Sequence, residues 1–265
     1  MYPSLSKIVK NIPRAMSDPK RAASLAWRRM FPFGIKPKDP EAYRIGSWSF
    51  GKANRVDLRD IFPGIEAADI KVFRSYDRKR DLSLDAQEVL ALCAIASHLG
   101  GSSVIEIGTS DGNTTLNLVA NSKSDARVTT VDLPEDWKGG FEIAVPEMMK
   151  NVTDRGRVGA QYRSSAHAGQ VVQVLGDSAK LDYAQLPGPF DLAFIDGCHF
   201  YDYVKVDTEN CFAHMRPGGA IVWHDYGMIE DVSRAVDEWS EKTGIPVSVV
   251  AGTRLAIARI PLSGR

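Results

Sequence analysis

The chain has few cysteines and no long apolar run, and these absences exclude several classes of protein. Its 265 residues include Cys93, Cys198 and Cys211, none of them in a CxxC pair. This spacing fits neither a disulfide framework nor a cysteine-rich zinc cluster, and it favours a reducing, cytoplasmic setting. No stretch of 18 apolar residues is present, so no membrane span is expected. The first residues show no continuous apolar segment, so no signal peptide is expected.

Net charge is also absent, but the two parts of the sequence carry opposite charge. Residues 1–80 hold 18 Lys and Arg against 8 Asp and Glu, whereas residues 81–265 hold 15 against 25. We therefore expect a basic helical or cap segment over 1–80 and one main domain over 81–265. The basic segment could contact a membrane surface, an acidic glycan or another subunit, could pair with the acidic domain, or could be a solvated face. A homo-oligomer is expected, and a nucleic-acid partner is not.

Hydrophobic periodicity from residue 83 onward alternates between strands and helices. It predicts strands over 103–107, 127–131, 171–175, 190–195, 220–223, 247–250 and 254–260. It predicts helices over 85–99, 115–120, 145–152, 204–214 and 229–242, with a basic helix in 20–31 and strand-like pieces at 55–58 and 70–73. Asp85 and Glu88 predict a capping box. The alternation indicates an α/β fold: a Rossmann-like, doubly wound sheet of seven strands that ends in an antiparallel hairpin.

Two of the predicted strands end at a carboxylate that lies beside a histidine in sequence. Asp196 follows one apolar run and has His199 three positions later, and Asp225 follows another, directly after His224. Because the carboxyl ends of parallel strands meet at the edge where α/β proteins bind ligands, these four side chains are expected at one rim. Such a set could hold a metal, move a proton, or do both.

A glycine turn after the first strand of the main domain predicts a ligand site. Gly108 and Gly112 allow the backbone to approach a ligand and to turn into a helix. The dinucleotide pattern GxGxxG is not met, because Ser110 and Asn113 stand where it requires glycine. Glu106, two residues before the first glycine, suits a ligand with a positive group better than a phosphate.

Acidic residues at the next two strand ends extend this site. Asp132 ends its strand and can accept both hydroxyl hydrogens of a ribose. Asp177 can accept from an exocyclic amine such as that of adenine, while the amide of Ser178 donates to the ring. Together these groups describe a nucleoside that carries a cation and no phosphate, and S-adenosylmethionine matches that description.

The order of these motifs resembles a known family. The sequence contains, in order, EIGTSDG, VTTVD, GDS, FDLAFIDG and RPGGAIVWHD. This order is similar to class I S-adenosylmethionine-dependent methyltransferases over roughly residues 83–260. The IDGCHFYDYVKVD segment followed by HDY resembles a bacterial branch with O-methyltransferases related to metal-dependent enzymes for macrolide-type sugars. The expected cofactor-binding residues are Glu106, Gly108, Thr109, Ser110, Gly112, Asp132, Leu133, Asp177, Ser178 and Asp196.

The histidine and acid pairs are expected to activate the methyl acceptor. Our hypothesis is that Asp196 and Asp225 hold Mg²⁺ and that His199 is the general base, and the resemblance supports both assignments. His224 completes the predicted metal set, although the metal-dependent relatives commonly carry a carboxylate there and imidazole is a poorer Mg²⁺ ligand. The site could therefore bind Mg²⁺, prefer Mn²⁺ or another transition ion, or work without metal through His199 or His224 alone.

The resemblance thus implies an O-methyltransferase that acts on a hydroxyl of a small-molecule or glycosidic acceptor. An NAD-type oxidoreductase on the same sheet is the alternative enzyme, and the missing glycines disfavour it. A non-catalytic nucleoside-binding protein of the same fold is a third interpretation. The sequence does not identify the acceptor, since specificity is expected to lie in residues 1–80 and 133–170, which carry no recognisable motif.

Overall fold

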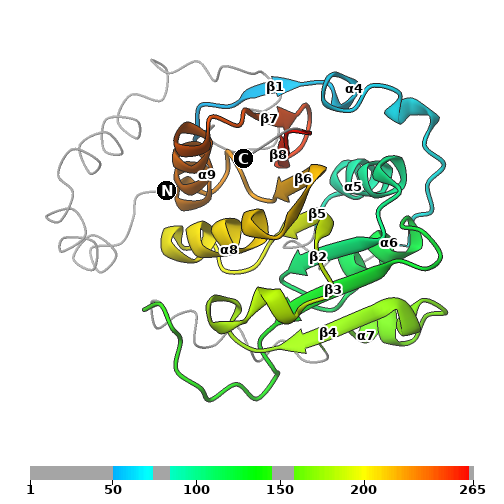
Figure 1. Ribbon diagram of the computed structural model, residues 1–265, viewed down its shortest axis with the longest axis vertical. Coiled ribbons are helices and arrows are strands. Elements are labelled where there is room, and N and C mark those ends of the chain that lie inside the picture. Colours follow the sequence, from blue (N-terminus) through cyan, green and yellow to red (C-terminus); the bar gives the residue numbers. More distant parts are fainter. Residues whose placement is uncertain (1–49, 74–83, 145–157, 263–265) are drawn as a thin grey trace, which may run out of the picture.

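An eight-stranded sheet forms the centre of the chain (Figure 1). The computed structural model describes residues 50–73, 84–144 and 158–262, so the helices predicted in 20–31 and over 145–152 lie outside the described residues. The strands are β1 (Asn54–Val56), β2 (Ser103–Ile107), β3 (Arg127–Asp132), β4 (Val171–Leu175), β5 (Phe190–Ile195), β6 (Met215–Trp223), β7 (Val247–Val250) and β8 (Ala256–Arg259). All seven strands predicted in the main domain are confirmed, and β1, an eighth, overlaps the strand-like piece predicted at 55–58.

The strand order is β1-β7-β8-β6-β5-β2-β3-β4. From β2 the chain builds β3 and β4 outward on one side, and then returns to build β5 and β6 on the other side, all in parallel. The order therefore reverses between β2 and β5, where ligands bind in doubly wound sheets. Strand β8 runs antiparallel to both β6 and β7, which confirms the predicted closing hairpin.

The extra strand comes from the basic part of the sequence. Strand β1 pairs in parallel with β7 at the edge of the sheet. The phenolic oxygen of Tyr226 accepts from the amides of Lys52 and Ala53 at 3.0 Å each, and it donates to Asp237. Tyr226 directly follows Asp225, so the chain that leads into β1 is fixed beside the carboxyl end of β6. The division at residue 80 stays a prediction.

Four longer helices cover the sheet. They are α5 (Ala86–Leu99), α6 (Asn113–Ala120), α8 (Tyr201–Ala213) and α9 (Glu230–Thr243). The other helices of the described residues are short: α4 (Leu58–Ile61) and α7 (Ala160–Arg163), with 3-10 turns at Ile65–Ala67, Ala168–Gln170, Ser178–Lys180 and Tyr183–Gln185. The predicted capping box is confirmed, because Asp85 accepts from the Glu88 amide at 2.9 Å and Glu88 accepts from the Asp85 amide at 2.8 Å.

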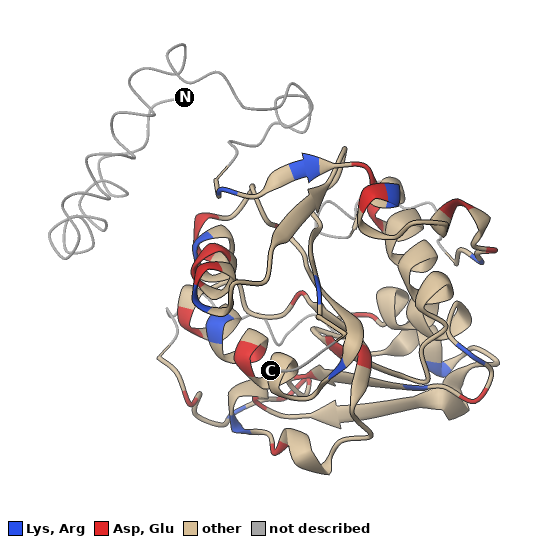
Figure 2. Cartoon of the chain, turned by 45° about the horizontal axis from the view of Figure 1, so that its top comes forward, with Lys and Arg blue, Asp and Glu red and all other residues tan. Residues whose placement is uncertain are grey.

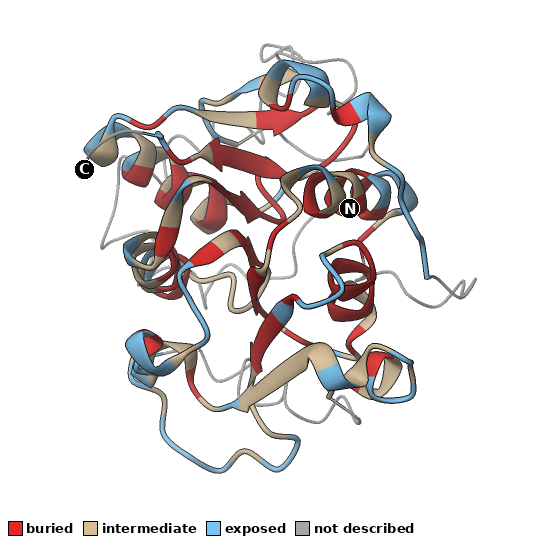
Figure 3. Ribbon diagram, turned by 45° about the vertical axis from the view of Figure 1, so that its right-hand side comes forward, coloured by how far each residue is buried: buried red, intermediate tan, exposed pale blue. Residues whose placement is uncertain are grey.

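Alternate residues of the central strands pack against opposite layers. In β2, Val104 belongs to the core under α5 and α6, whereas Ile105 and Ile107 belong to the core under α8 and α9. In β5, Phe194 and Ile195 divide in the same way. Figure 3 shows the central strands as buried between the two layers. Burial on both faces explains why these strands are continuously apolar in the sequence.

Strand β6 begins five residues before the predicted start at 220, because a Pro-Gly-Gly sequence interpreted as a turn is part of the strand. The pairing of β5 with β6 shifts in register between Phe190 and Leu192, opposite this segment. A Cβ atom at Gly219 would stand 2.8 Å from the carbonyl oxygen of Asp191, so the two backbones come closer there than a side chain permits. The glycine marks an irregular pairing rather than the end of a strand.

The strand predicted at 70–73 is wrong, and asparagine side chains explain the extended pattern. The amide and carbonyl of Lys71 pair with the side chain of Asn121, at 2.8 and 2.7 Å. Those of Phe73 pair with Asn117 at 2.9 Å each. Asn117 lies in α6 and Asn121, one turn later, is its C-cap. Helix side chains thus satisfy the backbone that a neighbouring strand would otherwise satisfy.

Charges on the described surface are mixed. Figure 2 shows acidic residues along α9 with basic ones between them. Lys52, close to β1, forms an ion pair with Glu241 of α9, so one described part of the basic segment does contact the acidic domain. Within the described residues, no helix is long and apolar enough to cross a membrane.

Candidate active site

The predicted ligand turn and the first acidic strand end are in backbone contact. Gly108 follows β2 with a φ of +104°, and Asp196 follows the neighbouring strand β5. A Cβ atom at Gly108 would stand 2.2 Å from the carbonyl oxygen of Asp196. Glycine is therefore required at this position on both conformational and steric grounds. The turn and the acid share one edge of the sheet, at its switch point.

Asp132 connects the turn to the end of β3. Its Oδ2 accepts from the Ser110 amide and its Oδ1 accepts from the Leu133 amide, each at 2.7 Å. The side chain is partly exposed. Because each carboxylate oxygen can accept more than one hydrogen bond, these amides hold the group in place and leave acceptor capacity for ligand hydroxyls. The structure thus brings Ser110, Leu133 and Asp132 together as a ribose site requires.

Glu106 supports the turn from below rather than lining its surface. It is fully buried, and its Oε2 accepts from the hydroxyls of Thr115 and Thr130. Its Oε1 has no hydrogen-bond partner among the described residues. Burial raises the pKa of this carboxyl to about 8. The hydroxyl of Thr109, also buried, pairs with the Thr130 hydroxyl at 2.7 Å. Buried polar side chains thus support the turn, and hydrophobic periodicity did not predict them.

Asp177 lies at the same edge, but protein groups cover it. The residue is 3% exposed. Its Oδ1 accepts from the Tyr203 hydroxyl at 2.9 Å and the Ala179 amide at 3.1 Å, and its Oδ2 accepts from the Glu142 amide at 2.8 Å. Ser178, partly exposed, begins the 3-10 turn that follows. Asp177, predicted to bind adenine, therefore lies at the expected strand end, but protein donors already occupy both of its oxygens.

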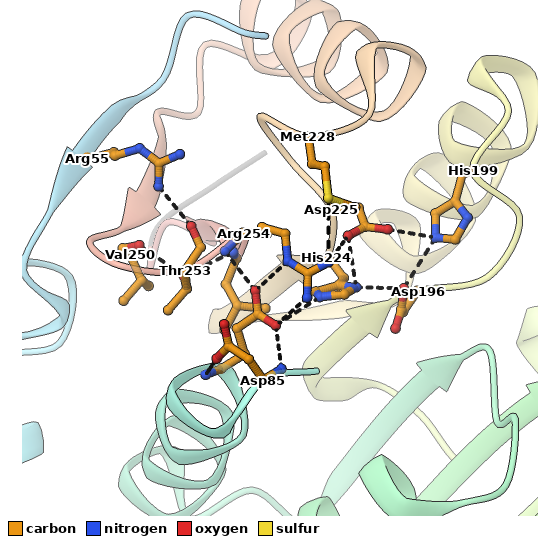
Figure 4. Close-up of polar contacts among 12 residues, drawn as sticks. Arg55, Asp85, Asp196, His199, His224, Asp225, Met228, Val250, Thr253 and Arg254 are labelled. Atoms are coloured by element: carbon orange, nitrogen blue, oxygen red, sulfur yellow. Dashed lines mark hydrogen bonds and ion pairs between the residues drawn. The ribbon is translucent and has the colours of Figure 1, made fainter. Parts of the chain in front are cut away.

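His199 stands between the two carboxylates at the rim. Its Nε2 lies 3.4 Å from Oδ1 of Asp196 and 3.4 Å from Oδ2 of Asp225 (Figure 4). The His199 side chain is 37% exposed, whereas those of the acids are 19% and 9% exposed. The imidazole can thus meet a substrate while the acids orient it. This geometry suits a general base.

His224 lies behind the rim and is held at both ring nitrogens. Its Nδ1 lies 3.0 Å from Oδ1 of Asp196, and its Nε2 lies 3.2 Å from Oε2 of Glu88. Ionised carboxylates only accept, so both nitrogens donate and the ring is an imidazolium. Burial lowers the pKa of this ring, but Asp196 and Glu88 outweigh that effect and raise it to about 10. For the Asp196 carboxyl, burial raises the pKa instead, but His224 and His199 outweigh that effect and lower the pKa to about 2.

Arg254 secures the second carboxylate. Its Nη1 donates to Oδ1 of Asp225 at 2.7 Å, and its Nε and Nη2 donate to Glu88 at 2.9 and 2.8 Å. Asp225 has a φ of +58°, unusual for a residue other than glycine, and these contacts hold it there. Burial raises the pKa of Glu88, but His224 and Arg254 hold it well below its usual range. The sequence analysis assigned Glu88 to a helix cap and gave Arg254 no role.

Among the described residues, one group of side chains brings its donor atoms close enough together to hold a metal ion. It consists of Asp196, His199 and Asp225, whose donor atoms all lie within 4.8 Å of one another. His224, predicted as a ligand, lies outside this group because both of its nitrogens are bonded to carboxylates. Donor atoms about 2.1 Å from one octahedral ion stand about 3 Å apart, close to the 3.4 Å separations seen here. The three side chains therefore fit a divalent cation, and their imidazole favours one softer than Mg²⁺.

Residues 105–226 match a protein-family model described as a methyltransferase domain. Over 97 residues the chain is 31% identical to demethylmacrocin O-methyltransferase of Streptomyces fradiae, a match that covers 34% of this chain and 24% of that protein. The cofactor-bound structure of Rv0187 from MTB is similar in fold, with a TM-score of 0.52 and 20% identity over 78% of this chain and 90% of that one. The O-methyltransferase TomG of Streptomyces achromogenes has a TM-score of 0.49 and 17% identity over 68% and 82%.

Proposed function

We propose that this chain is a class I S-adenosylmethionine-dependent methyltransferase and that it methylates a hydroxyl group of a small-molecule or glycosidic acceptor. The observation that carries the proposal is the position of His199, whose Nε2 lies between Asp196 and Asp225 beside the cofactor turn. A hydroxyl nucleophile needs such a base, because it must lose its proton near the transition state. The similarity to an O-methyltransferase supports this acceptor class.

The cofactor half of the site would bind S-adenosylmethionine along the ends of β2, β3 and β4. The methionine portion would lie against the backbone of the glycine turn, where Gly108 is in close contact with Asp196. Asp132 would accept from the ribose hydroxyls while the Ser110 and Leu133 amides hold it. Asp177 and Ser178 would meet the adenine at the end of β4, which requires Asp177 to exchange its bond from Tyr203 or Glu142 for one from the exocyclic amine.

In the reaction, the acceptor oxygen attacks the methyl carbon of the sulfonium from the side opposite sulfur. The new carbon–oxygen bond forms as the carbon–sulfur bond breaks. The electron pair of the carbon–sulfur bond stays on sulfur, and the product is S-adenosylhomocysteine. The other ring nitrogen of His199, Nδ1, would take the hydroxyl proton, because Nε2 faces the two carboxylates and donates its hydrogen to them. Three carboxylates (Glu88, Asp196 and Asp225) and two cations (His224 and Arg254) leave one net negative charge beside His199, which stabilises its imidazolium as it forms.

Metal-assisted activation by Asp196 and Asp225 is the alternative to this mechanism, with His199 rather than His224 as the third ligand. A divalent cation held there would lower the pKa of an acceptor hydroxyl. An imidazole that binds a cation through Nε2 carries its hydrogen on Nδ1 and cannot take a second proton, so the roles of ligand and base exclude each other at His199. The two carboxylates already have cationic partners, His224 and Arg254, which favours the base role.

A cytoplasmic location, a homo-oligomer and an anionic partner for the basic segment also stay predictions.

Calorimetry tests the cofactor assignment against the alternatives. S-adenosylmethionine and S-adenosylhomocysteine should each bind to the full chain, and NAD should not. Binding of NAD without either sulfur ligand would favour the oxidoreductase. Binding of the sulfur ligands without transfer from S-[methyl-³H]adenosylmethionine to any of a broad panel of sugars, phenols and polyketide alcohols would favour the non-catalytic protein. The control is Asp182→Asn, which changes an exposed acid that caps a 3-10 turn.

A further inference from the structure

We propose that Glu88, which is fully buried and cannot touch an acceptor, is a positioning residue that sets the two carboxylates on either side of His199. The inference rests on the proposed role of His199 as base. Glu88 acts through two cations: His224 on one side and Arg254 on the other. Each cation also binds one rim carboxylate, Asp196 or Asp225.

The first arm runs through the imidazole of His224. Its two nitrogens bind Glu88 at 3.2 Å and Asp196 at 3.0 Å, so the width of the ring fixes the distance between these two carboxylates. The His224 side chain is 2% exposed, so solvent does not replace either contact. The Oδ1 of Asp196 that receives this bond is the same oxygen that lies 3.4 Å from His199. A shift of Glu88 would therefore be transmitted to the base through one rigid ring.

The second arm runs through the guanidinium of Arg254. Two of its nitrogens bind the two oxygens of Glu88, at 2.9 and 2.8 Å, and the third binds Oδ1 of Asp225 at 2.7 Å. This planar fork leaves one orientation for the group. Asp225 then presents its other oxygen, Oδ2, to His199 at 3.4 Å. Both arms end at the same nitrogen of the base, so the contacts close into a ring.

Charge explains why the arms need a common carboxylate. Asp196 and Asp225 face one imidazole and repel each other, and a cation alone on each would be buried without full compensation. Glu88 compensates both cations at once, and its two oxygens also accept from the backbone amides of Asp85 and Arg254. A glutamine could not replace it, because its single acceptor oxygen and its NH₂ group would place a donor against His224 or Arg254.

The test compares Glu88→Gln with Asp85→Ala in full-length protein labelled with ¹⁵N in histidine. Asp85→Ala removes the cap bond to the α5 backbone but leaves the contacts of Glu88 with His224 and Arg254. The chain has five histidines, and His199→Gln assigns the ring signals of the base. We expect Glu88→Gln to shift the His199 ring nitrogens and Asp85→Ala to leave them in place. S-adenosylmethionine should bind both variants, since the cofactor would lie along the ends of β2, β3 and β4 and against the backbone of Asp196, which neither substitution changes.

A second variant keeps the outcome decisive if Glu88→Gln does not fold. Arg254→Lys retains a cation against Glu88 but cannot reach Asp225 at the same time, and it should also shift the His199 signals. On an acceptor from the panel, both variants should lower kcat about 10²-fold, as a displaced catalytic group does, with KM for S-adenosylmethionine unchanged. Unshifted His199 signals in a variant that binds the cofactor would overturn the inference. A wild type that fails to bind the cofactor would instead overturn the proposed function.

Discussion

Nε2 of His224 lies 3.2 Å from Oε2 of Glu88, although 136 positions separate the two residues in sequence. The contact joins the first turn of α5 to the residue that directly follows β6. It keeps His224 charged and directs its other nitrogen to Asp196. A residue that the sequence places among the metal ligands therefore acts as an internal cation of the site.

Asp132→Asn should weaken cofactor binding without unfolding the chain. Asparagine can still accept from an amide but loses the charge that strengthens hydrogen bonds from ribose hydroxyls. Loss of charge-assisted bonds of about 1.5–3 kcal/mol corresponds to roughly 10–100-fold in the dissociation constant. Calorimetry with S-adenosylhomocysteine measures this, and Asp182→Asn is the matched control. Unchanged affinity would remove Asp132 from the ribose site.

Glu106→Gln should stabilise the chain at alkaline pH. The folded-state pKa of Glu106 is raised to about 8 from 4.5, so the unfolded chain loses this proton first as pH rises. Stability therefore falls between these two values, and a neutral glutamine avoids that loss. We expect a gain of roughly 1–4 kcal/mol in the free energy of unfolding at pH 8 and none at pH 4. Urea unfolding at both pH values measures it, with exposed Glu66→Gln as control; equal effects of the two variants would contradict the account.

Tyr226→Phe should destabilise the edge of the sheet. The lost hydroxyl leaves the Lys52 and Ala53 amides and Asp237 without their shared partner, at a cost of about 1–3 kcal/mol. Tyr201→Phe is the matched control, because its hydroxyl bonds one exposed acid, Glu238. Thermal unfolding should rank the two variants in that order, and the reverse order would show that Tyr226 does not anchor β1.

Whether a site residue could be predicted from the sequence depends on how far apart in sequence its contacts lie. Parallel strands bring their carboxyl ends to one edge, so Asp132, Asp196 and Asp225 could be placed together from periodicity alone. The partners of Glu88 could not, because they come from the end of β6 and the β7–β8 turn, more than 130 positions away. No local pattern encodes such contacts.

Two errors in the element assignment have a similar cause. The Pro217–Gly219 segment has the composition of a turn, but the register shift between β5 and β6 keeps it within a strand. Residues 70–73 have the alternation of a strand, but their backbone bonds to asparagines on α6. In both cases tertiary contacts decided between local conformations that the sequence allows equally.

Chelation separates the two uses of His199. The account assigns the proton to an unligated imidazole, so dialysis of the enzyme against EDTA should leave methyl transfer to a panel acceptor intact. Asp225→Asn should then lower kcat through a misplaced His199 and show no rescue by Mn²⁺. Transfer that EDTA abolishes and Mn²⁺ restores would make His199 a ligand, and would assign acceptor activation to the cation.

The most direct measurement is transfer of the methyl group from S-[methyl-³H]adenosylmethionine to a hydroxyl acceptor by wild type, His199→Ala and the exposed control His98→Ala. The account predicts that His199→Ala binds the cofactor with wild-type affinity but transfers roughly 10²–10⁴-fold more slowly, while His98→Ala matches the wild type. Transfer at the wild-type rate by His199→Ala would contradict it.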